Sequence, residues 1–333
     1  MRVIAKLEVP ITGPQIRRLQ ALGASLIFCS AHAGIIGLDM EDSSSLKRLD
    51  FILEWRPSQK GQVLLHPALQ AVGVSALYEQ GLSGDGIWIS VIDSGIITSD
   101  PSLGRAVVAQ MDFTGEGVYD YALHGTLVAK IMNSIVANAS LLNAKAVDRY
   151  GDVDEIAVFQ ALEWSLDNDA DIANLSLGFQ RECHGNCWLC QFVNMLVERG
   201  MSVVAAGGNW GPSDGTISCP GSAVQAVTVG ATEAGAVAPY SSRGRPQQVK
   251  PDLVAPGTLE IGRFRFTGTS ISTPIVGGIL ASLFGEYDRK KVLGCLSKGC
   301  VDLGSARNQQ GYGQIDADKI LEVLQRGKNT GQD

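Results

Sequence analysis

The segment Gly268-Thr269-Ser270-Ile271-Ser272-Thr273-Pro274 places a serine between a glycine and an apolar run that continues from Ile275 to Phe284. Proline is tolerated in the first turn of a helix, so the segment predicts a helix that begins close to Ser270. The positive end of a helix dipole and the unpaired backbone N–H groups there stabilise negative charge. Taken alone, this pattern fits a capped, buried helix as well as it fits a serine nucleophile.

A serine nucleophile needs a general base, and the four histidines of the chain differ in their surroundings. His32 lies in an alternating N-terminal stretch, His66 precedes a proline, and His184 lies among cysteines. Only His124 opens an apolar helical pattern, and Gly125 beside it would let a substrate backbone approach closely. His124 is therefore the candidate base, although a histidine at a helix start is more often structural.

An aspartate follows the most strand-like part of the chain. Residues 87–92 read Ile-Trp-Ile-Ser-Val-Ile, a nearly continuous apolar run typical of a buried parallel strand, and Asp93 comes next. An aspartate at a strand end usually begins a turn, so Asp93 alone indicates little. The order Asp93, His124, Ser270 is one of the known orders of the Asp–His–Ser catalytic triad.

Further segments in the same order resemble the motifs of the subtilisin-like serine proteases, whose triad has this order. The resemblance covers roughly residues 61 to 325. It rests on the aspartate motif Val91–Gly95, the histidine motif His124–Thr126, the substrate-binding strand Asn174–Gly178, the oxyanion-asparagine motif Val203–Asn209 and the segment around Ser270.

The resemblance implies a serine endopeptidase that works through an acyl-enzyme, with no cofactor and no catalytic metal. Ser270 would be the nucleophile, His124 the base and Asp93 the residue that orients the base, while Asn209 would donate to the oxyanion. An extended peptide or protein substrate would bind between two strands, and Trp210 and Ser218 would line the primary pocket. The implied substrate-binding residues are Gly151, Asp152, Val153, Ser176, Leu177, Gly178, Trp210 and Ser218.

Two other functions remain open at this point. The chain could be a dedicated maturation protease for a single partner peptide, or a catalytically silent binding scaffold. The intact triad positions argue against a scaffold, because nothing would require them there. The charge of Asp152 or Glu155 could favour a basic residue at an upstream subsite, a preference that a peptide library would reveal.

The remainder of the chain predicts an α/β fold with a doubly wound, mostly parallel sheet, because strand and helix patterns alternate from Gly86 onward. Active sites of such sheets lie beyond the carboxyl ends of strands, and Asp93, Ser176 and Asn209 all follow predicted strands. The predicted strands are 87–92, 140–147, 171–175, 202–206 and 226–229, and helices are expected to begin near His124, Asp154, Trp188, Ser270, Asp288 and Asp316.

Residues 1–60 predict a separate α+β domain of the βαββαβ, ferredoxin-like type. This segment resembles the inhibitory pro-domains of many subtilisin-like proteases, and the alternative is a permanent accessory domain. The pro-domain would be a partner of the catalytic domain, predicted at 61–326, and would be cut off near Lys60–Val63. Residues 327–333 are expected to be a flexible tail.

Composition excludes several classes of function. The chain has 333 residues, 45% of them hydrophobic, and a net charge of −7, so we expect no nucleic-acid partner. The longest apolar run, around Ile275–Phe284, is too short to span a bilayer, so we expect no membrane segment. Residues 1–9 alternate without the apolar core of a secretory signal, which predicts a cytoplasmic location unless an upstream leader is missing.

Metal sites are expected to be few. The loop from Asn133 to Ser140 is short, and Ser102 stands where relatives often carry a calcium-ligating aspartate, so we expect the family's high-affinity calcium site to be absent. The carboxylates of residues 148, 152, 154 and 155 could bind a weak cation, although a solvated acidic loop fits them better.

The seven cysteines leave three alternatives open. The spacing Cys183-x3-Cys187-x2-Cys190 resembles a metal-binding pattern that Cys219 could complete as a zinc site. Related proteases can form disulfides in these loops, and a reducing cytosol favours free thiols, which is the leading interpretation. Cys295 and Cys300 could pair in the same way.

Overall fold

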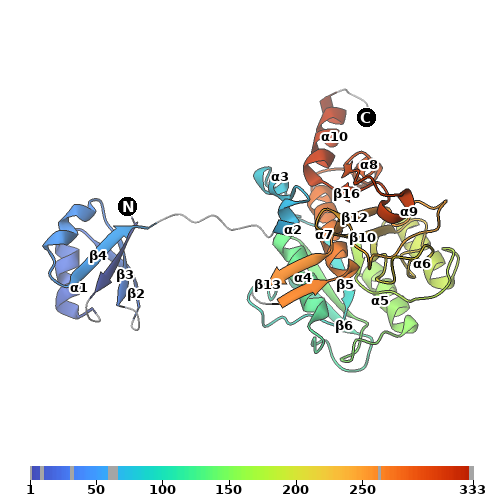
Figure 1. Cartoon of the computed structure of the whole chain (residues 1–333). Helices are drawn as coiled ribbons and strands as arrows, with labels where there is room; N and C mark the ends of the chain where they lie inside the picture. Colours follow the sequence, from blue (N-terminus) through green and yellow to red (C-terminus); the bar gives the residue numbers. More distant parts are fainter. Residues whose placement is uncertain (1, 8–10, 31–33, 59–66, 262–263, 330–333) are drawn as a thin grey trace. The chain divides into compact units, whose positions relative to one another are not determined.

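The computed structural model describes residues 2–7, 11–30, 34–58, 67–261 and 264–329, which form two compact units, 1–64 and 65–333 (Figure 1). The predicted domain boundary at residue 60 and the expected cleavage segment Lys60–Val63 lie outside the described residues.

The N-terminal unit has the predicted βαββαβ order, except that its second helix is a short 3-10 helix. The strand order β2-β3-β1-β4 is antiparallel throughout. Every second residue of the first strand, Val3, Ala5 and Leu7, points into the core of this unit. Leu19 and Leu46 are buried in the same core. The elements are β1 (Arg2–Leu7), α1 (Gly13–Ala21), β2 (Ser25–Cys29), β3 (Ile35–Asp39), η1 (Ser43–Arg48) and β4 (Ile52–Pro57).

The C-terminal unit contains a ten-stranded sheet, which confirms the predicted doubly wound α/β fold. Its order is β15-β16-β12-β10-β9-β8-β5-β7-β6, with β11 paired to β10, and the neighbours from β16 to β6 are parallel. The strands are β5 (Trp88–Asp93), β6 (Val107–Asp112), β7 (Ser140–Lys145), β8 (Ile172–Leu175), β9 (Ser202–Ala206), β10 (Val227–Glu233), β11 (Ala236–Val237), β12 (Leu253–Pro256), β15 (Cys300–Val301) and β16 (Gln314–Ile315).

Helices cover both faces of this sheet. In β5, Ile89 and Val91 pack towards α4 and α7, whereas Ile92 packs towards α5 and α6. Such two-sided burial explains why the strand reads as a continuous apolar run. The helices are α2 (Pro67–Gln70), α3 (Val74–Glu79), α4 (His124–Ile135), α5 (Glu155–Asp167), α6 (Trp188–Glu198), α7 (Thr269–Phe284), α8 (Arg289–Cys295), α9 (Arg307–Gln310) and α10 (Ala317–Asn329).

Strand β5 lies at the point where the strand order changes direction. After β5 the chain forms β6 and then β7 on one side of it, and next β8 and β9 on the other side. Ligands of doubly wound sheets bind beyond the carboxyl ends of the strands at such a point. Strand β5 ends at Asp93 and β8 is followed by Ser176-Leu177, so two of the predicted site segments lie at the carboxyl ends of these strands.

Some predicted boundaries were wrong. Helix α10 continues to Asn329, so the predicted tail from residue 327 begins inside a helix, and residues 330–333 lie outside the described residues. The hairpin of β13 (Thr258–Ile261) and β14 (Phe264–Thr267), which leads directly into α7, was not predicted, nor was β6.

Among the described residues, no helix combines the length and the apolar character that crossing a bilayer requires. The cytoplasmic location stays a prediction.

Helix α7 runs through the middle of the C-terminal unit, and most of its residues are buried on all sides (Figure 1). It packs closely against α4 because two glycines leave room for the partner. A Cβ atom on Gly277 would lie 2.8 Å from Met132 Cε, and one on Gly278 would lie 3.1 Å from Ile135 Cβ.

We therefore expect Gly278→Ala to lower the free energy of unfolding by about 1–3 kcal/mol, because the added methyl group overpacks the contact with Ile135. Gly294→Ala in α8 is the matched control, since nothing lies within 4 Å of its Cβ position. That variant should be neutral or stabilising by up to about 1 kcal/mol. Urea denaturation measures both, and equal effects would contradict the packing described here.

Candidate active site

A hydrogen bond joins the end of β5 to the start of α4. His124 Nδ1 lies 2.7 Å from Asp93 Oδ1, and Asp93 is 1% exposed. The same oxygen accepts the backbone N–H of Ser94 at 2.7 Å, while Asp93 Oδ2 is buried without a hydrogen-bond partner. The carboxylate therefore directs its charge at the imidazole.

This carboxylate controls the protonation of the ring. The negative charge of Asp93 raises the pKa of His124 to about 9, against the opposing effect of burial, and the hydrogen bond and the charge of Asp120 add to the increase. The histidine side chain keeps 40% of its surface exposed, so its outer edge faces solvent. The pair holds a proton on Nδ1 and leaves Nε2 as the nitrogen that can exchange protons with a ligand.

Asp120 is a buried carboxylate that the sequence analysis missed. It accepts hydrogen bonds from the hydroxyl groups of Ser94 and Thr126 at 2.8 and 2.6 Å, and from the backbone N–H groups of Leu123 and Thr126, both at 2.8 Å. Ser94 in turn accepts the N–H of Gly125 at 2.9 Å. Asp120 thereby positions the first turn of α4, which carries His124. No linear pattern around residue 120 signals this role.

The reason for Gly125 differs from the prediction. Gly125 does not face a substrate: a Cβ atom there would lie 2.3 Å from Gly95 O and 3.1 Å from Asp93 Cβ. Its role is to let α4 pack directly on the strand that carries Asp93. Leu123 adopts a left-handed backbone, with φ 64°, immediately before the histidine. A non-glycine residue in that conformation is costly, and such strain is common at functional sites.

Ser270 lies at the same end of the sheet as His124, because α7 and α4 are packed side by side. Gly277 meets Met132 and Gly278 meets Ile135. Ser270 precedes Gly277 by seven residues, about 10.5 Å of helix, and His124 precedes Met132 by eight, about 12 Å. Both N-termini therefore lie beyond the carboxyl edge of the sheet. Among the described residues, no hydrogen bond joins Ser270 Oγ to the ring, and such bonds often tighten only when substrate binds.

Pro274 is in the second turn of α7, not in the first as predicted. Proline has no N–H, so it cannot bond to the carbonyl four residues earlier, which belongs to Ser270. The hydroxyl of Ser176 lies 3.3 Å from this carbonyl and donates to it. Ser176, predicted as a substrate-binding residue, therefore also holds the backbone of Ser270.

Asn209 follows β9, with its amide orientation fixed by Thr269. Asn209 Oδ1 accepts the backbone N–H of Thr269 at 2.9 Å and its hydroxyl at 3.1 Å. Because the oxygen is used twice, Nδ2 remains the available donor. Asn209 Nδ2 and Ser270 Oγ both lie 3.2 Å from the position of a Cβ on Gly268, so the two groups flank the same space.

A cleft of about 280 Å³ opens beside the histidine. It is bordered on one side by the residues that follow β7 and on the other by those that follow β8. Asp152 is not among the lining residues, which are Asp93, Ser94, Ala122, His124, Val147, Gly151, Val153, Ser176, Leu177 and Gly178. Five of the eight predicted substrate-binding residues are thus brought together.

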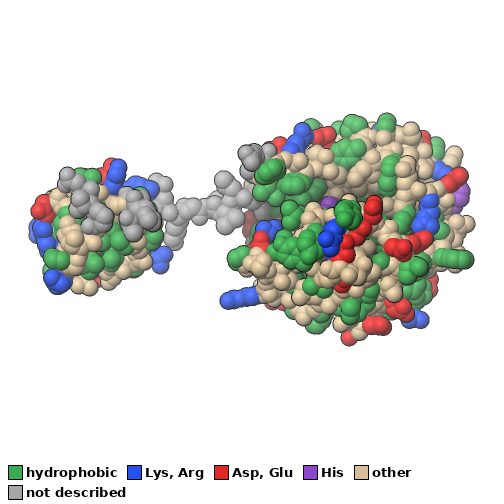
Figure 2. All heavy atoms as spheres, turned by 90° about the horizontal axis from the view of Figure 1, so that it is seen from below, with side chains coloured by type: hydrophobic (Ala, Val, Ile, Leu, Met, Phe, Trp, Pro, Cys, Tyr) green, Lys and Arg blue, Asp and Glu red, His purple; other side chains and the backbone are tan. Residues whose placement is uncertain are grey.

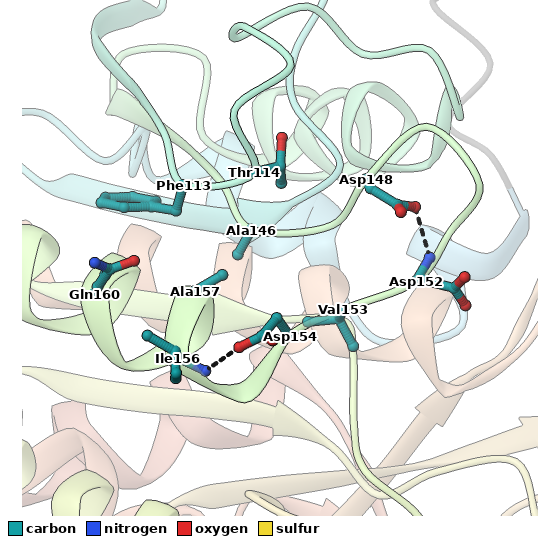
Figure 3. Close-up of a pocket in the computed structure, with 10 residues that line it drawn as sticks. All are labelled: Phe113, Thr114, Ala146, Asp148, Asp152, Val153, Asp154, Ile156, Ala157 and Gln160. Carbon is teal, nitrogen blue, oxygen red and sulfur yellow. Dashed lines mark hydrogen bonds between the residues drawn. The ribbon is translucent and has the colours of Figure 1, made fainter.

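The acidic loop lines a neighbouring pocket (Figure 3). Asp148 accepts the backbone N–H of Asp152 at 2.9 Å, and Asp154 caps α5 through the N–H of Ile156 at 2.7 Å. Glu155 is paired with Arg181 at 2.6 Å. These contacts give three of the carboxylates structural partners. Asp152 therefore remains the candidate carboxylate for contact with a basic residue of a substrate. Figure 2 shows acidic side chains beside a hollow of this unit.

Trp210 and Ser218 lie outside the set that lines the cleft. Ser218 is 1% exposed, and its hydroxyl group lies 3.1 Å from the carbonyl oxygens of Ala206 and Gly207. A Cβ on Gly178 would lie 2.5 Å from that hydroxyl, so Ser218 supports the wall of the cleft from behind. Its part in a primary pocket, like that of Trp210, stays a prediction.

In the region where we expect no calcium site, the ammonium group of a lysine pairs with the carboxylate of Asp100. Asp100 pairs with Lys130 at 2.5 Å and accepts the N–H and hydroxyl of Ser102 at 3.0 and 2.6 Å. The ammonium group lowers the pKa of Asp100 to about 2, so this carboxylate is ionised and its charge is balanced by that of the lysine.

All seven cysteines, Cys295 and Cys300 included, are free thiols in the structure.

The model of the subtilase family matches residues 84–295, which is more than half of the chain. The chain belongs to the subtilase family. It is 31% identical to Subtilisin E of Bacillus subtilis (strain 168) over 238 residues, covering 66% of this chain and 61% of that protein. It is also 31% identical to Subtilisin Savinase of Lederbergia lenta over 269 residues, covering 75% of this chain and 96% of that protein.

A solved structure shares the fold of the subtilase unit. The crystal structure of a lanthipeptide protease matches with a TM-score of 0.66 at 19% identity, covering 77% of this chain and 94% of that one. At this identity the likeness supports the α/β fold alone. The chain spans about 61% of the length of Subtilisin E.

We expect the ring of His124 to titrate well above its ordinary pKa of about 6.5, towards 9. Asp93→Asn should bring the pKa back down, because it removes the charge that raises it. The folded state should lose the stability contributed by this pair as pH rises from about 6.5 through 9. NMR titration of the ring in Ser270→Ala protein measures the shift, and equal pKa values with and without Asp93→Asn would contradict it.

Calcium should leave the melting temperature of calcium-free protein unchanged, with magnesium as the control. Saturation of a high-affinity site would instead add about 3 kcal/mol at a hundredfold excess over Kd. Calorimetry of the dialysed protein distinguishes the two results. A rise of several degrees that is specific to calcium would show that the expected absence is wrong.

Proposed function

We propose that this chain is a serine endopeptidase whose catalytic triad is Asp93, His124 and Ser270. The observation that carries the proposal is the 2.7 Å hydrogen bond between the buried Asp93 and His124, at the edge of the sheet where α7 begins. Membership in the subtilase family supports it, because the motifs that carry these residues resemble those of the subtilisin-like proteases.

In this proposal Ser270 Oγ attacks the carbonyl carbon of the scissile peptide bond while His124 Nε2 takes its proton. The oxygen of the tetrahedral intermediate carries the negative charge, and Asn209 Nδ2 and the backbone N–H of Ser270 donate to it. His124 then gives the proton to the leaving amine, the C–N bond breaks, and an acyl-enzyme remains. Water, deprotonated by the same nitrogen, attacks the ester and restores the Ser270 hydroxyl.

Asp93 serves this cycle by holding the Nδ1 proton and stabilising the imidazolium that forms. Because the free ring titrates near 9, the fraction of neutral base increases as pH rises towards that value. Activity on peptides should therefore increase over the same range. Substrates would be extended peptides, since Gly151–Val153 and Ser176–Gly178 border the cleft as two backbone segments to which a strand can add.

The N-terminal unit is proposed as a pro-domain that the protease itself removes. Its βαββαβ sheet buries one face, whereas the other face carries Ile4, Ile35 and Phe28, the last of them 56% exposed. The register places Ile4 and Ile35 on that outer face, opposite to Val3 and Ala5. These apolar side chains lie on an open face beside the charged Lys6, Glu54 and Arg56, and an open face with apolar side chains suits a domain that covers another surface before it is released.

Two alternatives differ from this proposal in a measurable way. A dedicated maturation protease would cleave one partner peptide and leave casein intact. A catalytically silent scaffold would bind peptides without reacting with a fluorophosphonate. The paired Asp93 and His124 favour the enzyme, because a scaffold has no need of a buried carboxylate aimed at an imidazole.

We expect the full chain to form a covalent fluorophosphonate adduct, seen by intact mass, that Ser270→Ala abolishes. Peptide hydrolysis should fall by about 10⁴-fold or more in Ser270→Ala and in His124→Ala, and the double variant should be no worse, because the residues act as a unit. The N-terminal unit should stay attached in Ser270→Ala, since self-cleavage requires the nucleophile.

The control is Ser297→Ala, an exposed serine after α8, which should label and mature like the unmodified chain. Labelling that persists in Ser270→Ala would assign the nucleophile elsewhere. Normal removal of the N-terminal unit in that variant would mean that another protease makes the cut.

A further inference from the structure

Four cysteines from three segments of the subtilase unit come together beside the substrate cleft. Cys183 lies before α6, Cys187 and Cys190 lie at its start, and Cys219 follows β9. All four sulfur atoms lie within 4.8 Å of one another, and Cys190 and Cys219 are fully buried. In the part of the chain that the structure describes, no other group of histidine, cysteine and carboxylate ligands is arranged to hold a metal ion.

The sulfur atoms form a connected cluster, not two separate pairs. Cys190 Sγ lies 3.6 Å from Cys183 Sγ and 3.2 Å from Cys219 Sγ, and Cys219 Sγ lies 2.9 Å from Cys187 Sγ. Four thiolates bound to one zinc at about 2.3 Å stand about 3.8 Å apart. Small outward movements of the side chains would therefore give a tetrahedral site.

Two backbone features of the cluster suit a sulfur atom that carries negative charge. The N–H of Gly185 lies 3.4 Å from Cys183 Sγ and donates to it. Cys187 is the N-cap of α6, so its sulfur lies at the positive end of an eleven-residue helix.

A positive charge is also present near the cluster. Arg181 is paired with Glu155 at 2.6 Å, and its guanidinium lies over the ring of Phe179, whose backbone pairs with Cys219. A zinc ion with four thiolates carries a net charge of −2, so a nearby guanidinium offsets part of it.

We propose that Cys183, Cys187, Cys190 and Cys219 bind one zinc ion as a structural site. Four protein thiolates leave no open position for water, which is the arrangement of structural and not of catalytic zinc. Binding would release the thiol protons, since the ligands must be deprotonated. This proposal is independent of the catalytic one, because no residue of the triad takes part.

The zinc would fasten the outer wall of the substrate cleft. The backbone of Cys219 is bonded to that of Phe179 in both directions, at 2.7 and 3.0 Å. Phe179 follows Gly178, which lines the cleft, and Ser218 packs against Gly178 from behind. A metal on Cys219 would therefore hold the segment around Gly178 in place through this pairing.

The test uses the full chain with Ser270→Ala, which prevents self-digestion, expressed with zinc and purified under reducing conditions. Metal analysis should give about one zinc per chain, and cobalt in its place should show the intense visible bands of a tetrahedral thiolate site. Cys187→Ser should lose most of the zinc, whereas the matched control Cys295→Ser, outside the cluster, should retain it.

Thiol counting keeps the proposal testable if Cys187→Ser does not fold. Of the seven thiols, four would be protected by zinc and three would react quickly, and a chelator should expose the others. Seven reactive thiols with no bound metal would overturn the proposal. So would a mass lower by four hydrogens, which would mean two disulfides. Loss of hydrolysis in Ser270→Ala leaves these readouts unaffected.

Discussion

The hydrogen bond between Asp93 and His124 is the interaction on which the whole site depends. A carboxylate that is 1% exposed is costly unless it is paired, so the fold must bring a donor to it. That donor comes from the first residue of α4, which can reach Asp93 only because Gly125 lets the helix pack against Gly95. One contact therefore fixes the end of β5, the start of α4 and the tautomer of the histidine.

Ser270, the proposed nucleophile, is positioned by a second set of constraints that begins in the middle of the molecule. The glycines of α7 allow close packing on α4, which sets both helix starts at the same edge of the sheet. Pro274 frees the carbonyl of Ser270, and Ser176 takes it up, so the substrate-binding segment and the nucleophile share a hydrogen bond. Asn209 is oriented by Thr269, the residue before the nucleophile. In the proposed mechanism, substrate binding and catalysis thus rest on the same few contacts.

Much of this could be predicted from the sequence, because local patterns decide it. The apolar run before Asp93, the helix that begins at His124 and the exact bounds of β9 follow from burial and periodicity. What could not be predicted depends on contacts made only after folding. Asp120 acts through partners up to 26 residues away, and Gly125 faces a strand and not a substrate. The sequence did predict that Cys219 could complete the cysteine cluster, and the fold brings all four sulfur atoms within 4.8 Å of one another.

The most direct test of the account is a crystal structure of the protein bound to a peptide aldehyde, which forms a reversible adduct with a serine nucleophile. We expect a covalent bond to Ser270 Oγ, an adduct oxygen within hydrogen-bonding distance of either Asn209 Nδ2 or His124 Nε2, and a peptide backbone paired with Ser176–Gly178. An adduct on another residue, or a Ser270 hydroxyl that stays beyond reach of the His124 ring with peptide bound, would contradict it.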